Sequence, residues 1–316
     1  MCYGSCQPLP SLLGALRIMR VFVTGATGWV GTAVVEELHA AGHSVVGLAR
    51  SDAAEAALVS AGVAAHRGSL EDLESLRAGA AAADAVVHTA FNHDFSRFAA
   101  NSEAEKRAID ALGSALAGSG KPLIVTSGVA LIAPGRTVTE DDVRDPSAVP
   151  FPRNPETAAF EAAERGARVS VIRLAPSVHG SGETHGFVPT VIGMAREHGR
   201  SAYAGDGTNR WPGVHVRDVA RLYRLALERA AEYAVYHAIA DEGVPFRTIA
   251  EIIGRRLNLP TVSLTGDDVG AHFGWFVNFA AIDASASSAK TRETLGWNPT
   301  EPTLIEDVDS AAYFPT

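Results

Sequence analysis

The sequence predicts an α/β fold in which helices cover both faces of a doubly wound, parallel sheet. Short apolar segments rich in β-branched residues alternate with helical patterns along most of the chain, as is typical of parallel sheets. The first strand leads through a glycine-rich turn directly into a helix. The chain has 316 residues, of which 47% are hydrophobic, so it can form a large core and a second, smaller unit.

The first unit is a strand at residues 20–24, a turn, and an amphipathic helix at residues 32–41. Apolar, β-branched runs bounded by loops predict further strands at residues 43–49, 63–66, 84–88, 122–126, 169–174 and 234–239, the last strand. Helices are expected between strands at residues 71–77 and 103–117. Because strands and helices alternate, we expect the strands to run parallel.

Capping signals and apolar stripes predict three later helices. Asn154 followed by Pro155 marks a helix start, because proline suits the first helical position. Asp218 is expected to cap a helix whose apolar face contains Val219, Leu222, Tyr223, Ala226 and Leu227. A similar stripe consists of Phe246, Ile249, Ile252, Ile253 and Leu257. Long loops are expected at residues 133–154 and within residues 177–208, and such loops carry substrate sites in folds of this class.

The run RVFVTGATGWVG at residues 20–31 contains the pattern GxxGxxG between the first strand and the first helix. Gly25 permits a tight turn, Gly28 lets the backbone approach a phosphate, and Gly31 lets the helix pack closely. Unpaired N–H groups and the positive end of the helix dipole can hold a pyrophosphate there. The alternative is a glycine-rich turn without a ligand. The predicted cofactor contacts at this turn are Gly25, Thr27, Gly28, Trp29 and Val30.

Charge and cysteine content exclude several classes of function. The formal net charge of −9 argues against nucleic acid or an anionic membrane as the main partner. Cys2 and Cys6 both precede the first strand and provide neither a disulfide framework nor metal-ligand spacing. Residues 1–18 lack signal-peptide features and are expected to be a disordered extension, with Met19 an alternative start. No apolar run approaches about 18 residues, so we expect a soluble, cytoplasmic protein.

Several motifs resemble those of the extended short-chain dehydrogenases/reductases, a family that includes epimerases and dehydratases. TGATGWVG is similar to that family's TGxxGxxG loop, and RLAPSVHG at residues 173–180 to its RPxxVYG stretch. Residues 68–72 resemble its GDLxD segment, residues 87–90 its HxA run, and residues 210–218 the segment leading to HVxD. The resemblance implies a Rossmann-type cofactor domain at residues 19–176. It implies a smaller, discontinuous substrate domain at residues 177–316, with about 214–240 returning to the Rossmann core.

The resemblance also assigns positions around a nicotinamide cofactor. Ser69 and Leu70 would lie near the adenine. The other implied cofactor contacts are His88, Thr89, Ala90, Thr126, Pro176 and Val178. Ser127 occupies the place of the family's catalytic serine. A homodimer formed through helices near residues 103–117 and 154–165 is also implied, although their alanine-rich faces could equally pack internally.

One departure separates this chain from ordinary members of that family. The family's proton donor is the tyrosine of a YxxxK motif, which the family's spacing puts near Phe151, with the lysine near Pro155; no YxxxK occurs in this chain. The family's helix asparagine would fall near Ala104 or Glu105 and is also missing. A positioned general acid contributes about 10²- to 10⁴-fold to a rate. The chain is therefore identified as an atypical member, in which the ordinary mechanism is not expected.

Two side chains are candidates for the missing chemistry. Ser127 could hydrogen-bond a substrate carbonyl, or its hydroxyl could only make local loop bonds. His179 could donate a proton near neutral pH, or it could be a hydrogen-bonded loop histidine. Asn92, His93 and Asp94 could line the pocket or form a polar surface loop. His185 and His215 also lie near predicted loops, but the spacing of His179 and His185 lacks a metal-site pattern, so no metal is expected. The predicted pocket walls are Phe91, Asn92, Phe151, Phe187 and Trp211.

The end of the second strand indicates which nicotinamide cofactor binds. NAD-specific sites keep an acidic residue there for the ribose 2′-hydroxyl, but this chain has Ala49, followed by Arg50 and Ser51. A guanidinium and a hydroxyl suit a 2′-phosphate. The sequence therefore predicts NADP(H).

Together these residues predict an atypical NADP(H)-dependent reductase that acts on a small organic carbonyl or a related group. Ser127 would orient the substrate, and His179 or water would supply the proton. Two alternatives stay open, namely an epimerase or dehydratase that uses the nicotinamide transiently, and an NADP(H)-binding regulatory or sensor protein without enzymatic activity.

Overall fold

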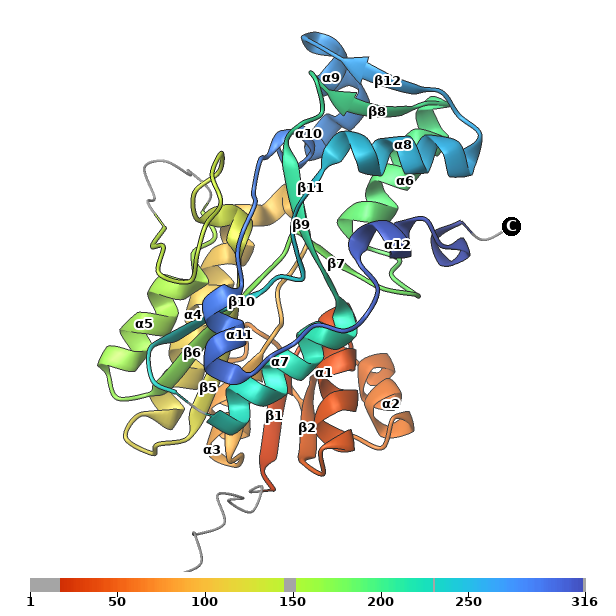
Figure 1. Cartoon of the computed structure of the whole chain (residues 1–316). Coiled ribbons are helices and arrows are strands. Elements are labelled where there is room, and N and C mark those ends of the chain that lie inside the picture. Colours follow the sequence, from red (N-terminus) through yellow and green to blue (C-terminus); the bar gives the residue numbers. More distant parts are fainter. Residues whose placement is uncertain (1–17, 145–151, 230, 315–316) are drawn as a thin grey trace, which may run out of the picture.

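The computed structural model describes residues 18–144, 152–229 and 231–314, and its centre is a parallel sheet of seven strands (Figure 1). The predicted α/β, Rossmann-type fold is confirmed. Phe151 and the predicted N-terminal extension, apart from Ile18, lie outside the described residues.

The order of strands across this large sheet is β3–β2–β1–β4–β5–β6–β10. The strands are β1 (Arg20–Thr24), β2 (Ser44–Ala49), β3 (Ala64–Arg67), β4 (Ala85–His88), β5 (Pro122–Gly128), β6 (Arg168–Leu174) and β10 (Ala234–Ala238). Their positions lie close to those predicted, because all but β3 are largely apolar runs bounded by polar residues or glycine. The prediction that β10 is the last strand is wrong, since strands at Asp241–Pro245 and Thr261–Leu264 follow it. The winding direction reverses between β1 and β4. In sheets of this kind ligands bind outside the carboxyl ends of the strands at that point.

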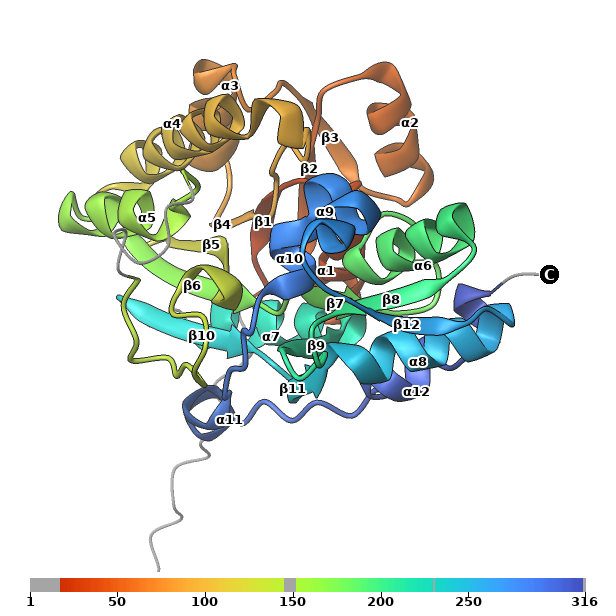
Figure 2. The ribbon, with the colours of Figure 1, turned by 90° about the horizontal axis from the view of Figure 1, so that it is seen from above.

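Helices cover both faces of the large sheet (Figures 1 and 2). One face packs against α1 (Trp29–Ala40), α2 (Asp52–Ser60), α7 (Val216–Arg229) and α11 (Ala289–Leu295), and the other against α3 (Leu73–Ala81), α4 (Phe98–Leu116) and α5 (Pro155–Glu164). Side chains of β1 alternate between these layers, as the pleat of a strand requires. Val21 and Val23 join the core beneath α1 and α7, and Phe22 joins the core beneath α3 and α4.

All three later helices are confirmed, and Val219, Leu222, Tyr223, Ala226 and Leu227 are buried on α7 as predicted. The carbonyl oxygen of the Asn154 side chain accepts a hydrogen bond from the Thr157 backbone, and Pro155 is the first residue of α5. The apolar stripe that starts at Phe246 forms α8 (Phe246–Leu257). Both signals are local, so tertiary packing did not override them.

The cap predicted at Asp218 is wrong. α7 already begins at Val216, and the fully buried Asp218 carboxylate accepts hydrogen bonds from the backbone N–H groups of Thr300 (3.0 Å) and Glu301 (3.1 Å). Asp218 therefore fastens the C-terminal segment to the first turn of α7. An acidic residue near a helix start can cap the helix or bind another segment of the chain, and the sequence alone does not distinguish these two roles.

The remaining elements form a lobe above the carboxyl ends of the large sheet, called the upper lobe below (Figure 1). It contains α6 (Phe187–His198), β8 (Ser201–Ala204), β12 (Thr261–Leu264), α8, α9 (Asp267–Phe273), the 3₁₀ helix η3 (Gly274–Phe276), α10 (Val277–Ala281), α12 (Leu304–Val308) and η4 (Ala311–Tyr313). A three-stranded sheet of β7 (Ser177–His179), β9 (Arg210–His215) and β11 (Asp241–Pro245) connects it to the large sheet. The prediction of a long loop within residues 177–208 is therefore largely wrong, because β7, α6 and β8 occupy most of that range.

Two short 3₁₀ helices follow strands of the large sheet, η1 (Phe95–Arg97) after β4 and η2 (Val129–Leu131) after β5.

None of the helices in the described part of the chain is long and apolar enough to cross a membrane. Nor do its His, Cys, Asp and Glu side chains form a group of three or more that could hold a metal ion.

Candidate functional site

The glycine turn after β1 is held against the loop that follows β4. Gly25 has a φ of +74°, and a Cβ there would lie 2.7 Å from the Thr89 hydroxyl and 2.8 Å from the Ala90 nitrogen. A Cβ on Gly31 would lie 1.9 Å from the Gly25 carbonyl oxygen. Gly25 and Gly31 are therefore required by the turn itself, since a side chain at either position would clash with fixed neighbours.

The N-terminus of α1 opens onto this turn without a capping side chain. Gly28 is the N-cap, no side chain caps the helix, and the first turn contains no acidic residue. The N–H groups of Trp29, Val30 and Gly31 precede the first intrahelical donor, Thr32, so they lack helical partners. Their geometry fits a bound pyrophosphate, because an anion completes their hydrogen bonds and meets the positive end of the helix dipole.

Trp29 connects the glycine turn to the upper lobe. Its indole nitrogen donates a 2.7 Å hydrogen bond to the carbonyl oxygen of Val178 in β7. Its ring also lies against Gly180, where a Cβ would come within 3.2 Å. Two predicted cofactor residues, Trp29 and Val178, are thus in contact, and Pro176 lies half-buried just before β7.

The carboxyl end of β2 presents a free cation. The Arg50 side chain is exposed and has no ion-pair partner among the described residues. Ser51 caps α2 by accepting a hydrogen bond from the Ala54 nitrogen at 3.2 Å. Ser69 accepts a bond from the backbone of Glu71, and Leu70 packs on the core under α3 and α4.

The end of β4 is fixed by two side chains that bond to β1. Nδ1 of the buried His88 lies 2.8 Å from the Thr24 hydroxyl, and the Thr89 hydroxyl donates to the Thr24 carbonyl at 2.8 Å. Burial lowers the pKa of His88 to about 3, and the positive charge of the nearby Arg153 contributes to the same shift. The ring is therefore neutral, and its buried Nε2 has no hydrogen-bond partner among the described residues.

Thr126 in β5 is tied to neighbours on both sides. Its hydroxyl donates to the His88 carbonyl at 2.7 Å and lies 2.6 Å from the Tyr223 hydroxyl. Because a hydroxyl has only one proton, Tyr223 is the donor in the second bond. Burial raises the pKa of Tyr223, so this tyrosine keeps its proton and does not replace the missing acid.

Ser127 takes part in a buried ionic network. Its hydroxyl donates a 2.7 Å bond to Glu156, the second residue of α5. Glu156 also receives two bonds from Arg173 of β6, at 2.8 and 2.7 Å, and Arg173 is 2% exposed. The single proton of Ser127 is thus used by a protein carboxylate, which corresponds to the local-bonding alternative described above.

A second ionic pair lies where the resemblance puts the family's tyrosine and asparagine. Pro155 is the first residue of α5, and just before it Arg153 reaches across to Glu105 of α4, with bonds of 2.9 and 2.6 Å. The Arg153 guanidinium lies over the Phe91 ring, 4.4 Å from its centre. Sequence reasoning missed Arg153 and treated Glu105 only as a missing asparagine. Neither Arg153 nor Glu105, taken alone in the sequence, indicates that the two side chains are paired.

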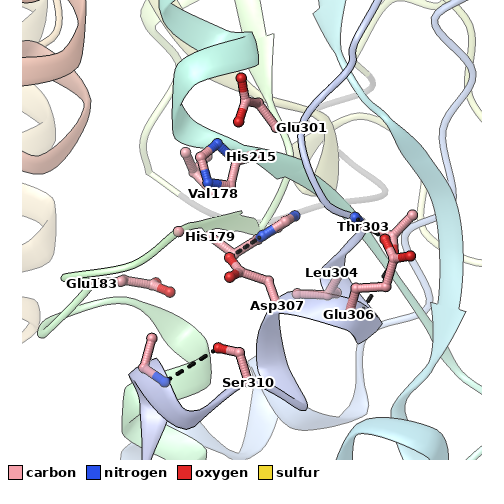
Figure 3. A network of polar contacts seen from close by, with 12 residues as sticks. Val178, His179, Glu183, His215, Glu301, Thr303, Leu304, Glu306, Asp307 and Ser310 are labelled. Atoms are coloured by element: carbon pink, nitrogen blue, oxygen red, sulfur yellow. Dashed lines mark hydrogen bonds and ion pairs between the residues drawn. The ribbon is translucent and has the colours of Figure 1, made fainter.

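His179 is fully buried and pairs with Asp307 of α12 (Figure 3). Its Nδ1 lies 2.8 Å from the Asp307 carboxylate, while its Nε2 is buried without a partner among the described residues. The ring packs edge to face against His215, 5.6 Å between centres. Ser127 and His179 therefore bind two different carboxylates, and they do not form one hydrogen-bonded pair.

Glu183 lies beside this pair (Figure 3), and its carboxylate is bonded to Tyr313 of η4. The Tyr313 hydroxyl donates to Glu183 at 2.5 Å and accepts from the Gly180 backbone at 3.0 Å. Burial raises the pKa of Glu183 to about 7, and the charge of Asp307 acts in the same direction. The C-terminal segment is thus fastened to the loop that packs on Trp29.

The predicted pocket walls fall into two groups. Phe187 and the fully buried Trp211 lie 5.6 Å apart in the aromatic core of the upper lobe, where the Trp211 indole donates to a backbone carbonyl. Phe91 and Asn92 lie half-buried after β4. The loop beyond them is polar, since Asp94 receives the Ser96 backbone N–H. His185 is exposed and bonds to Thr184.

Comparison with known proteins agrees with this architecture. A model of the NAD dependent epimerase/dehydratase family matches residues 21–239. An uncharacterized protein of Schizosaccharomyces pombe is 44% identical over 299 residues, covering 94% of this chain and 100% of that protein. An uncharacterized protein of Saccharomyces cerevisiae is 41% identical over 292 residues, covering 92% of this chain and 98% of that protein.

Two further matches have described activities. A 4-hydroxy-2-methyl-3-oxo-4-farnesyl-3,4-dihydroquinoline-1-oxide ketoreductase of Stigmatella aurantiaca is 27% identical and covers 81% of this chain and 80% of that protein. The crystal structure of a dTDP-glucose 4,6-dehydratase from Streptomyces venezuelae, with NAD bound, superposes with a TM-score of 0.71 at 19% identity, covering 92% of this chain and 96% of that chain. The chain belongs to the NAD-dependent epimerase/dehydratase family.

Proposed function

We propose that this chain is an NADP(H)-dependent oxidoreductase that reduces a small organic carbonyl compound. The observation that carries the proposal is the uncapped N-terminus of α1 together with the unpaired Arg50 at the end of β2. The first suits a pyrophosphate and the second a 2′-phosphate. The ketoreductase relative and the NAD-containing dehydratase structure support nicotinamide chemistry in general.

In this proposal each part of the cofactor meets a defined group of residues. The N–H groups of Trp29, Val30 and Gly31 hold the pyrophosphate, and Arg50 with Ser51 holds the 2′-phosphate. The remaining contacts come from Thr27, Ser69, Leu70, His88, Thr89, Ala90, Thr126, Pro176 and Val178. Residues 19–176 then act as the cofactor domain and residues 177–316 as the substrate domain, apart from α7 and β10, which pack with the large sheet.

When bound, NADPH supplies the hydride that, with one proton, converts a carbonyl into an alcohol. Ser127 orients the carbonyl by turning its hydroxyl away from Glu156, whose charge Arg173 still balances through two hydrogen bonds. His179 is enclosed and bonded to Asp307, so water is the better source of the proton. Without a tuned acid, the rate depends mainly on orientation, which can contribute about 7–11 kcal/mol.

The test is a fluorescence titration of the full chain with NADPH and NADH. Tighter binding of NADPH is expected, with the preference lost in Arg50→Ala, because one charge-assisted pair to a phosphate contributes about 1.5–3 kcal/mol. Arg196→Ala is the matched control, since Arg196 is an exposed arginine of α6 far from β2. Equal affinity for both cofactors removes the NADP(H) assignment, and binding of neither removes the proposed function.

A panel of ketones and aldehydes then separates reduction from the two alternatives. A reductase oxidises NADPH stoichiometrically with at least one panel member, and Ser127→Ala lowers that rate. An epimerase or dehydratase turns over without net consumption of the cofactor. A sensor binds NADP(H) and shows neither activity.

A further inference from the structure

Arg153 presents one edge of its guanidinium to Glu105 and leaves the other edge free. Nε and Nη2 donate to the two oxygens of Glu105 at 2.9 and 2.6 Å, which is the side-on bidentate arrangement. Nη1 has no acceptor among the described residues. A guanidinium has five N–H donors in a fixed plane, so the end-on pair formed by Nη1 and Nη2 can still bind a second planar oxyanion.

The surroundings of Arg153 hold that free edge in place. The Glu105 carboxylate is 2% exposed, whereas the Arg153 side chain is 16% exposed. Phe91 covers one face of the guanidinium at 4.4 Å. The pair also connects α4 to the segment that leads into the neighbouring helix α5 (Figure 2). The group is therefore fixed by a bidentate pair and an aromatic ring, so little conformational entropy is lost when it binds a ligand.

Arg153 also lies beside the loop that follows β4, which packs against the glycine turn. The Arg153 guanidinium covers the ring of Phe91. Phe91 comes directly after Thr89 and Ala90, and Gly25 packs against these two residues. The positive charge of Arg153 is close enough to His88, at the end of β4, to add to the lowering of the His88 pKa by burial. The Arg153 guanidinium thus lies near the carboxyl end of β4, where the sheet reverses its winding.

The other charges in this part of the chain are already paired. Glu156 is neutralised by Arg173, and His88 is kept neutral by its burial. Glu105 holds the opposite edge of Arg153 and cannot turn to the free edge without breaking both of its bonds. An incoming anion therefore meets an oriented pair of N–H donors that no other described carboxylate occupies.

From this geometry we infer that the end-on edge of Arg153 binds a carboxylate of the substrate, so that the substrate is an oxo acid. This inference rests on the proposed function, because it names the substrate class of the same site. Two parallel N–H···O bonds fix the carboxylate plane and hence the position of the neighbouring carbonyl. A neutral ester or amide lacks this interaction. Replacing a charged partner by a neutral one lowers affinity by about 10- to 100-fold.

The test uses the full chain saturated with NADP⁺ and calorimetric titration with malonate and with its neutral diamide, malonamide. Neither probe contains a reducible ketone, so binding is measured apart from turnover. The wild type is expected to bind malonate at least about tenfold more tightly than malonamide. Arg153→Lys keeps the charge but lacks the planar fork and should lose most of this preference.

The double variant Glu105→Gln/Arg153→Gln controls for a purely structural role, because it leaves no unpaired buried charge behind. It should keep the NADPH affinity and the unfolding temperature while losing the preference for malonate. Arg196→Gln should retain the NADPH affinity, the unfolding temperature and the preference for malonate. No preference for malonate in the wild type, or a preference that survives in both Arg153 variants, would overturn the inference.

Activity gives a second, independent readout. Among reducible compounds, 2-oxobutyrate and acetoacetate should be consumed faster than their methyl esters, and Arg153→Lys should remove that difference. If NADPH binds but malonate is not preferred, only this inference fails. If the wild type does not bind NADPH, the proposed function fails first.

Discussion

Substituting Gly31 by alanine tests whether the close approach of α1 to the glycine turn is essential. The new Cβ would lie 1.9 Å from the Gly25 carbonyl oxygen, 2.7 Å from its carbonyl carbon and 3.1 Å from Cα of Ala26. All three are backbone atoms, so no side chain can move aside. Overpacking costs about 1–3 kcal/mol, whereas alanine in a helix gains about 1 kcal/mol over glycine. We expect a net loss of up to about 2 kcal/mol in the free energy of unfolding, with tenfold or more weaker NADPH binding, because the displaced N–H groups are those that face the pyrophosphate in the proposed complex.

Gly193 provides the matched control. It lies within α6, is exposed, and a Cβ there meets nothing within 4 Å. Gly193→Ala should therefore raise the free energy of unfolding by about 0.5–1 kcal/mol and leave NADPH affinity unchanged. Urea unfolding and a fluorescence titration measure both quantities in the two variants. If Gly31→Ala is as stable as Gly193→Ala and binds NADPH as the wild type does, the reasoning about the turn is refuted.

Three further predictions concern buried polar groups. The pKa of Glu183 is raised to about 7, so its contribution to stability is complete below pH 4.5 and is lost as the pH rises through 7; urea unfolding should show a loss of about 3 kcal/mol over that window in the wild type and not in Glu183→Gln. Parallel pH profiles would contradict this. Tyr223→Phe leaves the Thr126 hydroxyl without its donor and should cost about 1–2 kcal/mol, whereas the exposed Tyr233→Phe should cost almost nothing in the same unfolding assay. Asp218→Ala removes the acceptor of two backbone N–H groups and should cost about 3 kcal/mol and speed proteolysis of the C-terminal segment; an unchanged digestion rate would mean that the segment is held elsewhere.

The parts of the fold that the sequence could predict are those with local causes. Six of the seven strands are largely apolar runs bounded by polar residues or glycine, and the stripe beginning at Phe246 repeats at helical spacing. Asn154 is recognisable because Pro155 follows it, and Gly25 because it belongs to the glycine pattern between a strand and a helix. Apart from α8, the upper lobe lacked such signals, since β8 and β12 have four residues each and pair across a long separation in sequence.

The site could be predicted only up to the cofactor turn. Ser127 and its carboxylate are 29 residues apart, Arg153 and Glu105 are 48 apart, and His179 and its carboxylate are 128 apart. No spacing rule connects residues at such separations, because the packing of the helices brings them together. The motif positions were therefore informative, whereas the partners that determine what each side chain can do were not.

Two buried ionic pairs lie where the resemblance puts the family's tyrosine and asparagine. Arg173 of β6 holds Glu156 of α5, and Arg153, just before α5, holds Glu105 of α4. Buried pairs of this kind are costly to break, because the remaining charge is left unpaired. In the function proposed above, Arg153 is an oriented cation that fixes an anionic substrate. The proposed reaction therefore relies on catalysis by orientation, with water as the proton source.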